Sequence, residues 1–231
     1  ELLPSMAIIS NLDLIRRVPL FALLPQQQAQ LVADAVTKKR FKRGENLVEQ
    51  GKNSGALFII LSGRARVVLS NELGREVILA RVGQGDCIGE MSLIDGEPHS
   101  ATVSTETQLD ALVLGRQAFS QCLSANSLLA EAVMRALVQR LRNADRKIES
   151  LALLDVYGRV ARALIEMADR NSQGQLVIAE KISRQDIAKS IGASREMVSR
   201  VMKEFGERDY FEENSDGSVL IHDHLMHKGL W

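Results

Sequence analysis

The side chains with the clearest chemical pattern lie in one short segment, Arg195–Lys203. If this segment is helical, its apolar residues fall on one face and its long polar residues on the opposite face. The inward residues are Val198, Val201, Met202 and, one turn on, Phe205. The outward residues are Arg195, Glu196, Ser199, Arg200 and Lys203. Arginine can donate two hydrogen bonds to guanine O6 and N7, and glutamate can accept one from cytosine N4, so this face is suited to reading DNA bases.

The flanking segments predict the elements that would hold this helix against DNA. Ser183, three residues before Asp186, indicates the start of a preceding helix, and Gly192 supplies the left-handed residue that ends it. Ser194 then caps the second helix, which gives the order helix, glycine turn, helix. After it, FEENSDGSVLI predicts a β-hairpin around Asp216-Gly217. Together these signals predict a winged helix-turn-helix.

A second set of side chains is better suited to phosphate oxygens, which fix the register of a protein on DNA but carry no sequence code. This set comprises Ser183, Arg184, Gln185, Ser194 and Ser199. The alternative interpretation is two ordinary solvated helices, because charged side chains are common on helix surfaces. The capping, the glycine turn, the separation of faces and the hairpin occur together and in order, which favours DNA binding.

A second segment, GEMSLIDGEPHSATV (residues 89–103), has the composition of a loop that holds a phosphate. It combines a glycine, an acid and a short apolar stretch that could start a helix. Backbone N–H groups near Met91 and Ser92 would then supply an anion site. His99 is expected to be the most exposed polar position of the loop, where a loop for a charged phosphate would be expected to carry arginine. With an ordinary pKa of about 6.5, His99 would be mostly neutral at pH 7.

The segment from about Asn126 to Ala152 predicts one long helix without proline or glycine. Apolar residues recur there every seven positions, in two lines: Ala130, Leu137, Ala144 and Leu151, and Leu141 and Ile148. This a/d spacing favours two helices packed side by side, and therefore a homodimer. The alternative is an amphipathic helix that lies on the core of its own domain.

Nine of the sixteen glycines lie between Gly44 and Gly96, among short β-rich runs such as ALFIILSGRARVVLS and REVILARV. Regular turns between such strands predict an all-β roll. The segments NLDLIRRVPLFALL and PQQQAQLVADAV have helical spacing and should cap it. We therefore predict an α+β protein with a β-roll domain (residues 1–125), a long dimerisation helix (126–153) and a winged helix-turn-helix domain (154–231).

Composition and sequence motifs limit the classes of protein to which the chain can belong. Of the 231 residues, 45% are hydrophobic and 25% charged, as in a globular protein, and no apolar run approaches the roughly 18 residues that span a bilayer. Cys87 and Cys122 form no disulfide or metal pattern, which favours a reducing cytoplasm. No nucleophile elbow, P-loop or metal-hydrolase spacing appears, so no enzymatic activity is predicted. Residues 1–5 precede Met6 and could be a processing remnant.

Charge is unevenly distributed although the formal net charge is zero. Residues 181–203 carry six basic and two acidic side chains, whereas residues 204–216 carry six acidic and one basic. A basic patch bordered by an acidic one can orient a protein on DNA without making it bind every polyanion.

The chain after Asn11 resembles bacterial transcription regulators of the cyclic-AMP receptor protein and fumarate–nitrate regulator family. FKRGENLVEQGKNSGALFIILSGRARVV resembles the first half of the family's cyclic-nucleotide-binding roll, and GEMSL…PHSATV its phosphate-binding cassette. LALLDVYGRVARALIEMA resembles the hinge, and ISRQDIAKSIGASREMVSRVMK the helix-turn-helix. The resemblance implies a homodimer on a palindromic operator in double-stranded DNA, with RNA polymerase as a partner and half-sites like TGTGA. It places the base contacts on Arg195, Glu196 and Arg200.

The resemblance also implies a role for each position of the pocket. Gly89 and Glu90 match the ribose contacts of the cyclic-AMP binders, and Ser100 matches a phosphate contact. His99 stands where those proteins have arginine, and Ala144-Asp145 stand where polar residues meet adenine. A lost charge-assisted hydrogen bond costs roughly 1.5–3 kcal/mol, about one to two powers of ten in affinity. Tight binding of cyclic AMP is therefore not expected.

Three interpretations of the pocket stay open. It could bind another nucleotide such as cyclic di-GMP, since Arg142 and Asp145, one turn apart, could meet a guanine edge and a phosphate. It could hold no small molecule, or it could sense haem or redox state, although two cysteines are too few for an iron–sulfur cluster. No cofactor is required and no metal site is predicted, because HDHLMH lacks further ligands. The candidate ligand contacts are Gly89, Glu90, Met91, Ser92, His99, Ser100, Ala101, Arg142 and Asp145.

Overall fold

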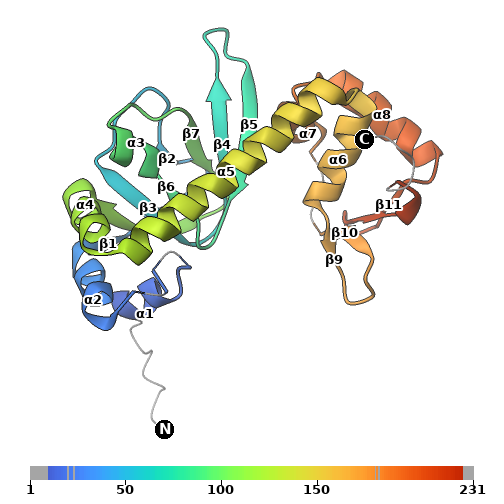
Figure 1. Ribbon diagram of the computed structural model, residues 1–231. Coiled ribbons are helices and arrows are strands. Elements are labelled where there is room, and N and C mark those ends of the chain that lie inside the picture. The colour runs from blue at the N-terminus through green and yellow to red at the C-terminus, as the bar shows by residue number, and fades with distance from the viewer. Residues whose placement is uncertain (1–9, 20, 23, 180, 182, 226–231) are drawn as a thin grey trace. The chain divides into compact units, whose positions relative to one another are not determined.

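The computed structural model describes residues 10–19, 21–22, 24–179, 181 and 183–225 (Figure 1). The chain divides into two compact units, residues 1–75 with 79–139 and residues 76–78 with 140–231. The division falls inside helix α5 (Ser127–Leu153), whose 27 residues confirm the predicted long helix. The three predicted domain boundaries stay predictions. No helix in the described part of the chain is long and apolar enough to cross a bilayer.

Among the described residues two helices precede the roll, α1 (Asn11–Arg16) and α2 (Gln26–Ala35). The predicted helix over NLDLIRRVPLFALL is wrong beyond Arg16. Pro19 has no backbone N–H to donate and disfavours helical geometry in the residue before it. The chain continues instead through turns that bury Val18 and Phe21. The apolar residues of this segment therefore reach the core as their spacing indicates, but they do so from turns and not from a helix.

Two four-stranded sheets form the roll, with the strand orders β1-β8-β3-β6 and β2-β7-β4-β5. The elements of this unit are β1 (Val36–Phe41), β2 (Asn46–Val48), β3 (Ala56–Ser62), β4 (Ala65–Ser70), β5 (Glu76–Val82), β6 (Cys87–Ile88), α3 (Glu90–Asp95), β7 (Thr102–Thr105), β8 (Leu109–Gly115) and α4 (Arg116–Ala125).

Strand β3 lies between two parts of the hydrophobic core. Leu57 and Ile59 pack into the cluster that also holds buried residues of α1, α2, α4 and α5. Phe58 and Ile60 pack into the cluster inside the roll. Because successive side chains of a strand point to opposite faces, burial on both faces explains the unbroken apolar run of β3. The predicted β-roll with capping helices is confirmed.

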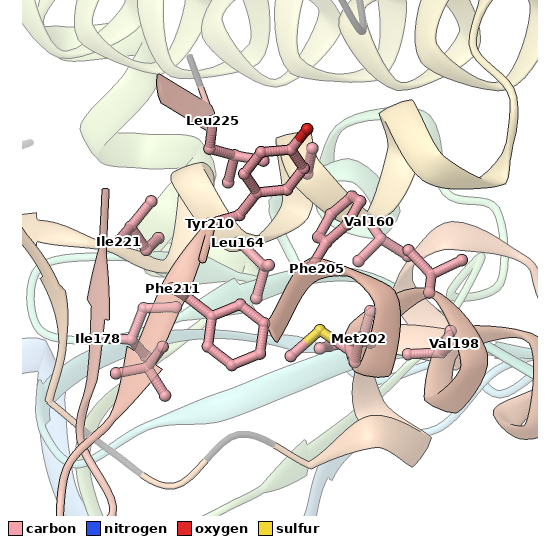
Figure 2. Packing of buried hydrophobic residues seen from close by; sticks show 14 of the residues in the cluster. Val160, Leu164, Ile178, Val198, Met202, Phe205, Tyr210, Phe211, Ile221 and Leu225 are labelled. Atoms are coloured by element: carbon pink, nitrogen blue, oxygen red, sulfur yellow. The ribbon is translucent and has the colours of Figure 1, made fainter. Parts of the chain in front are cut away.

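The second unit packs helices against a small sheet of order β11-β12-β10-β9. Its elements after α5 are α6 (Val156–Met167), β9 (Asp169–Arg170), β10 (Leu176–Ile178), α7 (Arg184–Ile191), α8 (Arg195–Glu207), β11 (Phe211–Glu213), β12 (Val219–Ile221) and a 3-10 helix (Asp223–Leu225). Figure 2 shows its core, in which the rings of Phe205 of α8 and Tyr210 lie side by side, with 5.3 Å between their centroids. The α+β class and the winged helix-turn-helix are thereby confirmed.

Candidate nucleic-acid interface and phosphate-binding loop

Two capped helices and a glycine turn form the helix-turn-helix. The Oγ of Ser183 accepts a hydrogen bond from the backbone N–H of Asp186 at 3.2 Å, which fixes the start of α7. Helix α7 ends at Gly192, whose φ of 65° lies in the left-handed region that glycine adopts without strain. The Oγ of Ser194 accepts from the N–H of Met197 at 3.2 Å and starts α8. Both predicted caps and the predicted turn are confirmed.

Helix α8 has the two faces that its sequence predicts. The inward side chains are at most 2% exposed: Val198, Val201, Met202 and Phe205. The outward side chains of Arg195, Glu196, Arg200 and Lys203 are exposed, and Ser199 is half-buried. Within the described part of the chain Arg195 and Arg200 form no ion pair, whereas Lys203 Nζ lies 3.7 Å from Glu207 Oε1. The two guanidinium groups in the first half of α8 are therefore not held by a carboxylate in the described part of the chain.

The side chains predicted to contact phosphate lie around the starts of the two helices. Ser183, Arg184 and Gln185 are exposed at the first turn of α7, and Ser194 is exposed before α8. Although each serine Oγ accepts a capping bond, its own O–H can still donate to a phosphate oxygen. Arg184 is already engaged, because its Nη2 lies 3.5 Å from Oε1 of Glu213 in β11. The sequence did not indicate this ion pair.

Helix α6 positions the other two helices through contacts that the sequence analysis missed. Arg159 Nη1 donates to the carbonyl oxygen of Ile191 at the end of α7, at 2.9 Å. The Tyr157 hydroxyl donates to Glu204 Oε1 of α8 at 2.8 Å, and this hydrogen bond raises the pKa of Tyr157. These contacts join residues more than 30 positions apart, so no local sequence pattern marks them.

Met197 is a further outward residue of α8 that the sequence analysis missed. Its side chain is exposed, and it lies three positions before Arg200 on the same face. An apolar side chain there can contact a thymine methyl group in the major groove. The available signal was its position between Glu196 and Val198 at the edge of the apolar stripe.

The candidate phosphate-binding loop is shaped by a glycine that no other residue could replace without strain. Gly89 has a φ of 96°, and a Cβ built there would lie 2.7 Å from the carbonyl oxygen of Ala56. Helix α3 begins at the next residue, and Glu90 and Ser92 are buried while Met91 is exposed. The turn therefore places an acid and a hydroxyl beneath the surface beside β3.

His99 is buried at 7% exposure, so the expectation that it is the most exposed polar position of the loop is wrong. Its Nε2 lies 2.7 Å from Oγ of Ser54. Its backbone N–H donates to the carbonyl of Lys52 at 2.9 Å, and its carbonyl accepts from the N–H of Gly51 at 2.8 Å. These bonds hold His99 beneath the loop between β2 and β3. Burial lowers the pKa of His99, so the imidazole is neutral at pH 7.

Replacing His99 by glutamine is expected to flatten the dependence of stability on pH below about pH 6.5. In wild-type protein the unfolded chain takes up a proton at His99 before the folded chain does, because burial lowers the folded pKa. The free energy of unfolding therefore decreases as pH falls through this range, and the variant lacks that contribution. Urea unfolding at a series of pH values measures it, with His224→Gln, at an exposed histidine, as the control. Equal pH slopes in wild type and His99→Gln would contradict this assignment.

The remaining candidate ligand residues lie in the bend before β7 and on α5. Ser100 is exposed and Ala101 is buried beside His99. Arg142 and Asp145 are exposed, three positions apart on α5, and belong to the second compact unit. Their place in one site with the phosphate-binding loop stays a prediction. Within the described residues, no three His, Cys, Asp or Glu side chains are grouped to hold a metal ion; His227 lies outside that part.

Helix α5 presents a long apolar stripe that the chain itself leaves exposed. Its large exposed apolar side chains are Leu128, Met134, Val138, Leu141, Ile148, Leu151 and Leu153. Met134, Leu141 and Ile148 are spaced seven residues apart, the period of a coiled-coil seam. Leu137 packs partly against the core of the first unit instead. The first half of the helix therefore lies on the core of its own unit, as one interpretation expects, and the exposed stripe has no partner in the described chain. The homodimer stays a prediction.

Two families of known domains match this chain, one over the roll and one over the helix-turn-helix. Residues 38–126 match a family model described as cyclic nucleotide-binding domain, and residues 158–225 match one described as Crp-like helix-turn-helix domain. The CRP-like cAMP-activated global transcriptional regulator of Mycobacterium tuberculosis is 31% identical over 186 residues, which cover 79% of this chain and 83% of that protein. The cAMP-activated global transcriptional regulator CRP of Escherichia coli O157:H7 is 31% identical over 170 residues, or 71% and 80% of the two chains.

The fold recurs in solved structures. The c-di-GMP responsive global regulator CLP of Xanthomonas campestris superposes with a TM-score of 0.72 at 24% identity, over 86% of this chain and 99% of that one. The two matched segments thus cover the roll and the helix-turn-helix. The chain belongs to the CRP-like family of DNA-binding transcription regulators, with an N-terminal cyclic nucleotide-binding domain and a C-terminal Crp-like helix-turn-helix domain.

Proposed function

We propose that this chain acts as a homodimer that binds a two-fold-symmetric operator in double-stranded DNA and regulates transcription there together with RNA polymerase. The observation that carries this proposal is the outward face of α8. Arg195, Glu196 and Arg200 are exposed on a helix whose opposite face is fully buried and whose start is fixed by a serine cap. This arrangement supports insertion of the start of α8 into the major groove.

The apolar stripe of α5 supports the homodimer. Leu141 and Ile148 are 62% and 64% exposed on one face, and large exposed apolar stripes mark association surfaces. A seven-residue period suits a second copy of the same helix. A dimer also supplies the second recognition helix that a two-fold-symmetric operator requires, about 34–36 Å from the first.

We further propose that the roll senses a cyclic nucleotide other than cyclic AMP, with cyclic di-GMP as the first candidate. Gly89, Glu90 and Ser100 keep the pattern of a sugar and phosphate site, but the neutral His99 cannot make the charge-assisted phosphate contact of an arginine. Two relatives are named as cAMP-activated, and CLP is named as c-di-GMP responsive.

A second candidate is a regulator that needs no effector. It is favoured by the hydrogen bond between His99 and Ser54. This bond gives the imidazole a partner within the protein, so the imidazole needs none from a ligand. Calorimetric titration of the full-length protein with cyclic di-GMP, cyclic AMP and cyclic GMP separates the candidates. We expect saturable binding of cyclic di-GMP and weak binding of cyclic AMP. No heat from any of the three would favour the effector-independent regulator.

Light scattering with a palindromic duplex tests the DNA-binding proposal independently of the effector. A complex mass that corresponds to two chains per duplex is the expected result. A mass of one chain per duplex, or no complex on any duplex, would contradict the proposal.

His99→Arg is expected to raise the affinity for cyclic AMP about tenfold, because a guanidinium can donate two charge-assisted hydrogen bonds to the cyclic phosphate. The affinity of the cyclic-AMP binders is not expected, since Ala144 and Asp145 would still not supply the polar contacts to adenine. Ser54→Ala is the matched control, as it frees the same site but adds no cation. If wild-type protein binds cyclic AMP at micromolar concentration or better, and His99→Arg brings no gain, this interpretation of the pocket is wrong.

A further inference from the structure

The wing of the helix-turn-helix domain carries only acidic charge. Residues 209–221 contain no lysine or arginine, and Glu212, Glu213 and Asp216 are exposed. At the turn, Asp216 accepts hydrogen bonds from the hydroxyl of Ser218 at 2.6 Å and from its backbone N–H at 2.9 Å. These bonds lower the pKa of Asp216 and fix its carboxylate in the ionised form. A DNA phosphate that approaches β11 meets the exposed carboxylates of Glu212 and Glu213.

The acidic wing also reaches the residue assigned to phosphate at the start of α7. Oε1 of Glu213 lies 3.5 Å from Nη2 of Arg184, and both side chains are about half exposed. Glu212, the preceding residue on β11, is exposed and forms no ion pair in the described part of the chain. Since neighbouring residues of a strand point to opposite sides, only Glu213 is directed toward Arg184.

We propose that Glu213 is a positioning residue that competes with DNA phosphate for Arg184. In the free protein the guanidinium is held by Glu213, so a phosphate must displace this carboxylate before Arg184 can bind it. The competition acts only on the phosphate contact and leaves Arg195 and Arg200 untouched. Because phosphate contacts supply nearly all of the affinity for random DNA, Glu213 weakens sequence-independent binding. The inference rests on the proposed DNA-binding function.

Glu213→Gln removes the competing charge, and Glu212→Gln removes an equal charge one residue away that does not contact Arg184. Fluorescence anisotropy with a random-sequence duplex at several salt concentrations measures both variants. We expect Glu213→Gln to raise affinity about two- to fivefold, the range of a surface ion pair, and to steepen the salt dependence. Glu212→Gln should change affinity less. In the Arg184→Gln background, Glu213→Gln should lose its effect.

Two results would overturn the inference: equal gains from Glu213→Gln and Glu212→Gln, or a gain from Glu213→Gln that persists without Arg184. Either result would show that Glu213 acts on DNA affinity only through general charge repulsion. Elution from a heparin column provides a second readout that does not need a DNA-binding function. There Glu213→Gln should elute at higher salt than Glu212→Gln, and only while Arg184 is present. If the protein binds no duplex but shows this heparin pattern, the proposed DNA-binding function is wrong, while Glu213 still competes with an anion for Arg184.

Discussion

Replacing both Leu141 and Ile148 by aspartate is expected to convert the protein from a dimer into monomers. Both side chains are largely exposed in the single chain, so the substitutions leave the fold of the monomer intact. In the proposed dimer positions 141 and 148 lie in the seam between the two helices. Each substitution there removes a buried apolar side chain and adds an unpaired charge, so the dimer would carry four such charges. We expect the dimer to weaken more than about a thousandfold. Sedimentation velocity at micromolar protein measures the change.

Leu31→Asp is the matched control for this experiment. Leu31 lies on α2 and is 63% exposed, against 62% for Leu141 and 64% for Ile148. It should leave the sedimentation coefficient unchanged. The double variant should also lose affinity for a palindromic duplex, since one recognition helix reads only half the site. A double variant that still sediments as a dimer would place the interface on another surface.

Arg200→Ala is expected to cost about 1–3 kcal/mol of binding free energy on the specific operator and to relax the preference at one base pair. The reason is the bidentate contact that a guanidinium makes with guanine O6 and N7, which alanine cannot replace. On random DNA the loss should be much smaller. Anisotropy titrations with the operator, with single-base variants of it and with a shuffled duplex give these values.

Two controls distinguish base reading from general charge. Arg208→Ala removes the same charge at the far end of α8, about 20 Å from its start, and should affect specific and shuffled DNA little. Gln185→Ala, at a residue assigned to phosphate, should weaken all sequences evenly. If Arg200→Ala weakens operator and shuffled duplex equally, Arg200 contacts only phosphate.

The helix-turn-helix could be predicted from sequence because its determinants are local. The serine caps, the left-handed Gly192 and the apolar spacing of α8 all act within a few residues, and each is found as predicted. The contacts that position this unit could not be predicted. Arg159 with Ile191, and Arg184 with Glu213, join distant residues, and nothing near either partner in the sequence specifies the other.

His99 shows the same limit in the phosphate-binding loop. Its type and its neighbours predicted an exposed loop residue. It is held in its buried position by hydrogen bonds with residues 51–54, which lie 45 or more positions earlier in the chain. Leu137 is a related case: the seven-residue spacing placed it in the seam, but the position of the roll decides that it packs partly on the first unit's core. Periodicity identifies an apolar face but not the surface that covers it.

Selection of bound duplexes from a random-sequence library by the full-length protein tests whether it reads a two-fold-symmetric operator. A homodimer with Arg195, Glu196 and Arg200 at the bases predicts enrichment of two inverted half-sites, each with G·C pairs, about one helical turn apart between their centres. Loss of the preference at one symmetric pair of positions with Arg200→Ala would assign the contact. Enrichment of an asymmetric single site, or no enrichment over the starting library, would contradict the account.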